Sequence, residues 1–249
     1  MAPLPKGSAA ALARSLRIYH GDAARNARMD ALYARFLKPG DLAFDIGAHV
    51  GDRVSSFRRL GARVVALEPQ PGPARVIRLI HGRDTQVILL QAAAGDREGE
   101  VTLRVNSANP TVSTVSAAFV QAAEDAGGWE GQVWDRALAV PCVTLDRLIA
   151  EHGRPAFIKI DVEGFEDRVL EGLSRPVPAL SFEFTTIARP VAQCCLERLS
   201  VLGPYRFDIA IGESQQLALN RWVNLDEMSG YLRELPHEAN SGDVYAVLD

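Results

Sequence analysis

The sequence predicts an α/β fold, a mostly parallel sheet with helices on both faces. Between residues 42 and 95, short apolar runs rich in β-branched residues alternate with amphipathic stretches, as in successive βαβ units. The alternation resumes after residue 156. A chain of 249 residues with 47% hydrophobic residues can bury one full core. Because we find no repeat or linker, we expect one domain over 1–249, with a helical extension at 1–38 and a core at 40–249.

The extension is predicted to contain two helices. Leu12, Leu16 and Tyr19 recur at helical spacing, and a second set of apolar residues does so between 29 and 36. The sequence HGD at 20–22 separates the two patterns, and Asp22 suits the N-cap of the second helix.

The core is predicted to alternate strands with helices. We expect strands at 42–47, 63–69, 87–95, 156–164, 179–184, 205–212 and 243–249, and helices at 54–61, 74–80, 165–173 and 190–200. A hairpin is predicted at 99–105, before a polar stretch at 106–116 and a segment that contains Trp129 and Trp134.

Composition excludes several classes of partner. The net charge of −4 gives no basic field for a phosphate backbone, so we expect no nucleic acid partner. No stretch approaches the roughly 18 apolar residues that span a bilayer, and the N-terminus lacks a continuous apolar leader. Three cysteines, two of them adjacent, do not form a disulfide framework. We therefore expect a soluble, cytoplasmic protein without a membrane partner.

The loop after the first predicted strand points to a ligand. Residues 44–52 read FDIGAHVGD, and in a parallel sheet ligands gather at the carboxyl ends of the strands. A dinucleotide fingerprint G-x-G-x-x-G that began at Gly47 would need glycine at His49 and Asp52, so it fails. Two acids, Asp45 and Asp52, also disfavour a diphosphate here.

A second acid favours a nucleoside without phosphates. Glu68 ends the second strand, 23 residues after Asp45, about where an acid accepts hydrogen bonds from a ribose diol. S-adenosylmethionine combines a ribose with an ammonium and a sulfonium, which Asp45 would suit. The alternative is that Asp45 caps a turn and Glu68 is a solvated strand end.

Five motifs in this order resemble the FkbM family of class I S-adenosylmethionine-dependent methyltransferases: FDIGAHVGD, VVALEPQP, AAAGD, TLDRLI and KIDVEGFEDRVLEGL, over roughly residues 40–185. The resemblance implies a Rossmann-like, seven-stranded, mostly parallel sheet with an antiparallel last strand, and methyl transfer commonly to a hydroxyl. It places the adenine at AAAGD. The residues assigned to the cofactor are Asp45, Gly47, Ala48, His49, Gly51, Glu68, Pro69, Ala94, Gly95 and Asp161.

The catalytic residues are predicted at the next strand ends. Alternation in IKIDVEG places Lys159, Asp161 and Glu163 on one face of a strand. Asp161 or Glu163 could remove the proton of an acceptor hydroxyl while Lys159 keeps the acid ionised. Glu183, in SFEF, is a further candidate for an acceptor contact. The alternative is a structural ion pair of Lys159 with Asp161 and a helix cap at Glu163.

The sequence leaves alternatives for a bound metal, for the methyl acceptor and for the class of function. A divalent cation on Asp161, Glu163 and Glu183 is conceivable, but without a metal-ligand spacing or a histidine partner we assign no metal ligands. The expected acceptor is a small molecule or carbohydrate, with nitrogen or carbon as alternative methyl acceptors. Rival functions are a nicotinamide-dependent oxidoreductase and a non-catalytic cofactor-binding accessory protein. The sequence says nothing about the oligomeric state.

Overall fold

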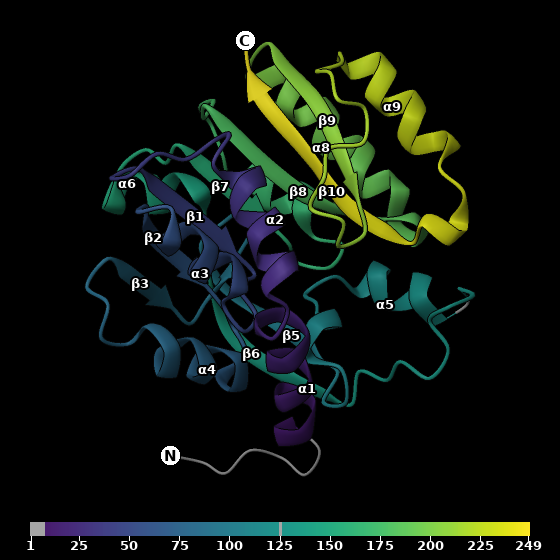
Figure 1. The fold of residues 1–249 in the computed structure, drawn as a ribbon. Helices are drawn as coiled ribbons and strands as arrows, with labels where there is room; N and C mark the ends of the chain where they lie inside the picture. The colour runs from purple at the N-terminus through teal and green to yellow at the C-terminus, as the bar shows by residue number, and fades with distance from the viewer. Residues whose placement is uncertain (1–7, 125) are drawn as a thin grey trace.

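The computed structural model describes residues 8–124 and 126–249, and a seven-stranded sheet forms its centre (Figure 1). The strand order is β3-β2-β1-β7-β8-β10-β9. These strands are β1 Leu42–Ile46, β2 Arg63–Leu67, β3 Val87–Leu90, β7 Phe157–Ile160, β8 Ala179–Thr185, β9 Tyr205–Ile211 and β10 Ser241–Leu248. Among the described residues, β10 runs antiparallel to both of its neighbours, β8 and β9, and every other pair in this sheet is parallel. The predicted fold class is confirmed, including the antiparallel last strand.

Helices connect the strands and cover both faces of the sheet (Figure 1). They are α1 Ser8–His20, α2 Ala23–Tyr33, α3 Asp52–Arg59, α4 Pro71–His81, α5 Ala117–Glu124, α6 Leu145–His152, α7 Glu166–Glu171, α8 Arg189–Leu202 and α9 Leu225–Glu234, with 3-10 helices η1 Pro110–Val112, η2 Thr186–Ala188 and η3 His237–Ala239. Asp22 caps α2 as predicted, because its Oδ1 accepts the Arg25 N–H at 3.0 Å.

Alternation along each strand separates two cores. In β7, Ile158 and Ile160 pack with α6, α7 and α8, whereas Phe157 packs with α2 and α3. Lys159 therefore shares the α2 and α3 side with Phe157, because successive side chains point to opposite faces. By the same alternation Asp45 of β1 lies on that side, opposite Lys159 in the register. The polar residues of the central strands thus gather beneath α2 and α3.

A second, three-stranded sheet corrects two predictions. Residues 99–105 do not form a local hairpin: β5 Gly99–Val105 pairs antiparallel with the distant strand β6 Arg136–Val143. The predicted strand 87–95 is split, because β3 ends at Leu90 and β4 Ala93–Ala94 pairs parallel with β6. The chain between β5 and β6 carries η1 and α5, and α1 contacts η1 (Figure 1).

The predicted strand 156–164 is also too long. β7 ends at Ile160, and the backbone turns left-handed at Glu163 (φ 57) and Gly164 (φ 83). Asp161 and Glu163 therefore lie in the loop between β7 and α7. The left-handed turn breaks the extended backbone that alternation assumes.

The N-terminal extension is helical where the structure describes it. Helices α1 and α2 occupy the predicted positions, and residues 1–7 lie outside the described part of the chain. The single-domain division stays a prediction. Within residues 8–124 and 126–249, no helix combines the length and apolar character needed to cross a bilayer.

Candidate active site

A cavity of about 280 Å³ lies at the carboxyl ends of β1, β2 and β7. Most of the predicted site residues line it: Asp45, Gly47, Ala48, His49, Glu68, Pro69, Ala94, Lys159, Asp161, Glu163 and Glu183. Gly51 and Gly95 are not among the lining residues. The structure thus brings the predicted cofactor and acceptor residues to one cavity.

Gly47 holds the first loop against the loop after β7. Its φ is +85°, and a Cβ built on it would lie 1.8 Å from the carbonyl oxygen of Asp161. The Asp161 N–H in turn donates to the Ile46 carbonyl at 2.9 Å. Only glycine fits this close approach, which sets the position of Asp161 relative to the first loop.

Gly51 and Gly95 each have a structural role. Gly51 is the left-handed N-cap of α3, with φ 80. Gly95 donates its N–H to the Val143 carbonyl at 3.0 Å, and a Cβ there would lie 2.9 Å from the Cys142 sulfur. Their predicted cofactor contacts stay predictions.

Asp45 is a buried acid with unused hydrogen-bonding capacity. It is 2% exposed, and its Oδ2 is buried without a hydrogen-bond partner among the described residues. Burial, reinforced by the nearby charge of Asp52, raises the pKa of Asp45 to about 7. A buried polar atom without a partner is costly, so Asp45 suits a cationic ligand that donates to it.

Glu68 is fixed in position by two backbone donors. Its Oε2 accepts the His49 N–H at 2.9 Å, and its Oε1 accepts the Gln70 N–H at 2.7 Å. Burial outweighs these bonds and raises the pKa of Glu68 to about 8. Glu68 is therefore a buried, oriented acid at the end of β2, and the alternative of a solvated strand end does not hold.

His49 sits on the wall in a left-handed conformation, with φ 46. Its ring packs edge-on against Tyr19 of α1 at a centroid distance of 5.5 Å. Its Nε2 is buried without a partner among the residues that the structure describes. Burial lowers the pKa of His49 to about 4, so the ring is neutral at physiological pH.

Lys159 links the sheet to Asp161. Its ammonium lies 3.1 Å from Asp161 Oδ2 and 2.6 Å from Asp243 Oδ1. Burial alone would lower the pKa of Lys159, but the two carboxylates raise it well above its usual value. The predicted ion pair of Lys159 with Asp161 exists, and Asp243 of β10 anchors it, a residue that sequence reasoning missed.

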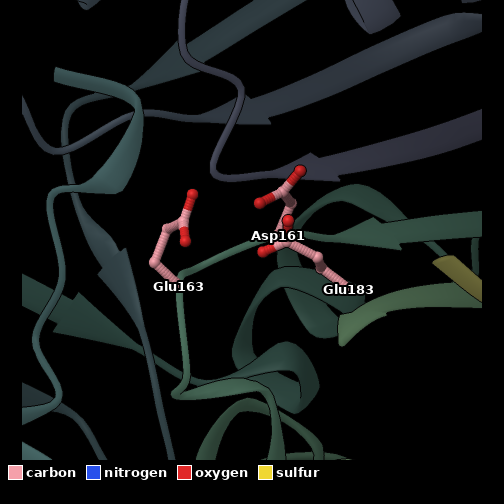
Figure 2. A group of neighbouring side chains, drawn as sticks. All are labelled: Asp161, Glu163 and Glu183. Carbon is pink, nitrogen blue, oxygen red and sulfur yellow. The ribbon is translucent and has the colours of Figure 1, made fainter. Parts of the chain in front are cut away.

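Three carboxyl groups converge at this end of the cavity. Asp161, Glu163 and Glu183 each offer one oxygen, and these oxygens all lie within 4.8 Å of one another (Figure 2). Burial works against ionisation of Asp161, but Lys159 and Arg53 lower its pKa. Burial and the neighbouring carboxylates raise the pKa values of Glu163 and Glu183 well above the usual range.

Glu163 does not cap the following helix. The N-cap of α7 is Phe165, which makes no side-chain cap, and Glu166 accepts hydrogen bonds from the Val162 and Gly164 N–H groups instead. Glu166 thus orders the turn that presents Glu163 to the cavity.

A buried ionic network forms a part of the wall that the sequence did not predict. Arg53 bonds Asp52 at 2.7 Å, and Arg25 bonds the same carboxylate at 3.0 Å. Both arginines also bond Glu213, from the segment after β9. Burial opposes ionisation of Asp52, but the two arginines lower its pKa to about 2. FDIGAHVGD did single out Asp52, whereas nothing in the sequence near Tyr19 or Glu213 marks a site.

The segment between β5 and β6 closes another side of the cavity. Residues 110–113 and Trp129 line it. The Thr114 hydroxyl donates to the Glu163 carbonyl at 2.6 Å, which ties this segment to the loop after β7. Trp134 instead donates its indole N–H to the Val112 carbonyl at 2.9 Å and supports the wall from behind.

This combination of sheet and site defines a class of protein. The strand order and the antiparallel last strand match the class I methyltransferase fold, and buried acids lie at the carboxyl ends of β1 and β2. The chain belongs to the methyltransferase FkbM domain family, whose model matches residues 45–235. The resemblance seen in the sequence is confirmed, and it replaces the oxidoreductase alternative.

The solved structures that this chain resembles are distant from it in sequence. Precorrin-6Y C5,15-methyltransferase from Geobacter metallireducens is 13% identical, with 90% of this chain and 87% of that chain covered and a TM-score of 0.46. A TehB-like SAM-dependent methyltransferase from Corynebacterium glutamicum is 8% identical, with 95% and 94% covered and a TM-score of 0.48. Fibrillarin from Aeropyrum pernix with natively bound S-adenosyl-L-methionine is 12% identical, with 84% and 67% covered and a TM-score of 0.41. No curated protein matches the sequence.

Proposed function

We propose that the protein transfers a methyl group from S-adenosylmethionine to an oxygen atom of a small-molecule or carbohydrate acceptor. The observation that carries this proposal is the arrangement of acids in one cavity. Asp45 and Glu68 lie at the ends of neighbouring strands, β1 and β2, and Asp161 directly follows β7, the strand on the other side of β1.

The first two acids fit the two ends of the cofactor. Glu68 is held by two backbone N–H groups with its carboxylate on the cavity wall, where it can accept hydrogen bonds from a ribose diol. Asp45 Oδ2 has no protein partner among the described residues and can accept a bond from an ammonium. Small residues at 92–94 leave room for a flat ring beside them.

The cofactor supplies an electrophilic methyl group on a sulfonium. Asp161, kept ionised by Lys159, would accept the hydrogen bond of an acceptor hydroxyl and hold its oxygen in line. Transfer of that methyl group to the acceptor oxygen would leave the methyl–sulfur electron pair on sulfur and release the hydroxyl proton, which Asp161 would accept.

The polar wall beyond Asp161 supports a hydroxylated acceptor. Glu183, Thr185, Asn240 and Ser241 line this part of the cavity and offer hydrogen-bond partners for several hydroxyl groups. The net charge of −4 supports a small acceptor over nucleic acid. All three cysteines are free, which supports a cytoplasmic location.

Turnover with a labelled donor tests this function. Purified protein is incubated with S-adenosylmethionine labelled with carbon-13 in the methyl group and with a panel of glycosides, phenols and amines, and products are read by carbon–proton correlation NMR. We expect a methoxy signal that Asp161→Asn abolishes. An N-methyl signal would contradict the oxygen acceptor, and cofactor binding without turnover on any acceptor would favour the non-catalytic alternative.

A further inference from the structure

We propose that Asp161, Glu163 and Glu183 bind a divalent cation of the Mg²⁺ or Mn²⁺ type at the acceptor end of the cavity. This inference deepens the proposed function and rests on it for the use of the cation.

The spacing of the three carboxyl groups suits one ion. Their nearest oxygens lie within 4.8 Å of one another (Figure 2). Two oxygens on opposite sides of an ion lie about 4.1 Å apart for Mg²⁺ and about 4.6–5.2 Å apart for Ca²⁺, twice the usual metal–oxygen distance. Small side-chain movements would therefore complete the coordination.

Glu163 gives an independent indication of a missing partner. Its side chain points into the cluster, and the residue is only 6% exposed. Its carboxyl group makes no hydrogen bond or ion pair with any residue in the described ranges 8–124 and 126–249. Glu183 Oε2 is likewise buried without a partner there. A buried carboxyl oxygen without a partner, such as Glu183 Oε2, is costly. Glu163 faces the cavity beside it, so one cation could bind both groups.

Lys159, the cation that pairs with Asp161, is already engaged. Lys159 bonds Asp161 and Asp243 and donates a long bond to the Ile160 carbonyl. An ammonium has three N–H donors, so Lys159 has none left for Glu163 or Glu183.

The ligand set indicates the class of metal. Three carboxylates without histidine or cysteine favour hard cations such as Mg²⁺, Mn²⁺ or Ca²⁺ over Zn²⁺. The cluster faces the cavity, so the remaining positions are open to water and to an acceptor oxygen. A cation there would orient the acceptor hydroxyl and lower its pKa.

Calorimetric titration without cofactor or acceptor tests the site. Chelator-treated protein is titrated with MgCl₂, MnCl₂ and CaCl₂, and the same series is run on Glu163→Gln, Glu183→Gln and the control Glu68→Gln, which lies outside the cluster. We expect saturable binding of at least one metal by the wild type. Each cluster variant should weaken it at least about tenfold, while the control leaves it unchanged.

A parallel titration with S-adenosylhomocysteine separates this inference from the proposed function. Wild-type protein that binds S-adenosylhomocysteine but none of the three metals would overturn the metal site and leave the methyltransferase proposal intact. Metal binding that survives in both cluster variants would also overturn it, because the ion would lie elsewhere. Metal binding with no affinity for S-adenosylhomocysteine would support the metal site and count against the proposed function.

Discussion

At the scale of single residues, Gly47 and Gly40 form a matched pair. Both have positive φ, +85° and +90°, but a Cβ at Gly40 meets nothing within 4 Å, whereas one at Gly47 would overlap the Asp161 carbonyl. Gly40→Ala should cost only the left-handed conformation, about 1–2 kcal/mol in the free energy of unfolding. Gly47→Ala should cost clearly more, because the first loop and the loop after β7 must separate.

Urea denaturation of both variants, with calorimetry of S-adenosylhomocysteine binding, checks this prediction. We expect Gly40→Ala to bind normally and Gly47→Ala to lose most of its affinity. Equal destabilisation of the two variants would mean that the close approach to Asp161 does not constrain the loop.

Glu68 should couple cofactor binding to pH. Its raised pKa of about 8 means that the free protein carries a proton there at pH 7, whereas hydrogen bonds from a ribose diol favour the ionised form. Binding should therefore release close to one proton at pH 7. Because the ionised fraction rises from about one in eleven to about one half, affinity should increase about fivefold from pH 7 to pH 8.

Calorimetric titration with S-adenosylhomocysteine in two buffers of different ionisation enthalpy measures the released protons. Glu68→Gln removes the titrating group, so it should bind more weakly and release about one proton fewer. Asp45, with a pKa of about 7, titrates in both proteins. Its contribution therefore cancels when the proton release of Glu68→Gln is subtracted from that of the wild type. The same proton release from both proteins would exclude Glu68 as the linked group.

At the scale of elements, the ionic network should hold α2 and α3 together beside the cavity. Arg25 of α2 and Arg53 of α3 share the carboxylate of Asp52, and the side chains of all three are less than a tenth exposed. Asp52→Asn leaves two buried guanidinium groups with Glu213 as their remaining acid, so it should lower the free energy of unfolding by about 3–5 kcal/mol.

The surface ion pair of Arg58 with Asp84 provides the control. Its side chains are 22% and 31% exposed, so Asp84→Asn should cost about 1 kcal/mol or less. Chemical denaturation of both variants at neutral pH gives the comparison. Equal costs would show that the network around Asp52 contributes no more than a surface pair.

Local patterns were enough to predict the central sheet. Apolar runs predicted β1, β2 and β7. The acids at the ends of these strands predicted the cavity, because the carboxyl ends of parallel strands lie at the same edge of the sheet. Helix pattern and capping likewise placed α2, with Asp22 at its N-cap.

The second sheet and the rest of the wall could not be predicted in this way. β5 pairs with a strand more than thirty residues later, from Gly99 opposite Cys142 to Val105 opposite Arg136, and no local pattern encodes that pairing. The left-handed turn includes Gly164 but begins at Glu163, and glutamate gives no local signal for a positive φ. Tyr19 and Glu213 reach the cavity only through the packing of distant segments.

At the scale of the whole molecule, the two faces of the sheet divide structural and chemical tasks. One face packs an apolar core against α6, α7, α8 and α9. The other face carries the buried polar residues Asp45, Lys159 and Asp243. Asp45 and Lys159 line the cavity at the strand ends. Both proposed substrates would therefore bind in one cavity, at the carboxyl ends of the strands.

The central claim is that this cavity binds S-adenosylmethionine, and calorimetric titration of the wild type and of Asp45→Asn with S-adenosylmethionine, S-adenosylhomocysteine and NAD tests it most directly. We expect saturable binding of both adenosyl ligands and no binding of NAD. Asp45→Asn should weaken binding of the adenosyl ligands, because it replaces a carboxylate that can pair with their ammonium group by a neutral amide that carries an N–H donor. Binding of NAD without the adenosyl ligands, or affinities that Asp45→Asn leaves unchanged, would contradict it.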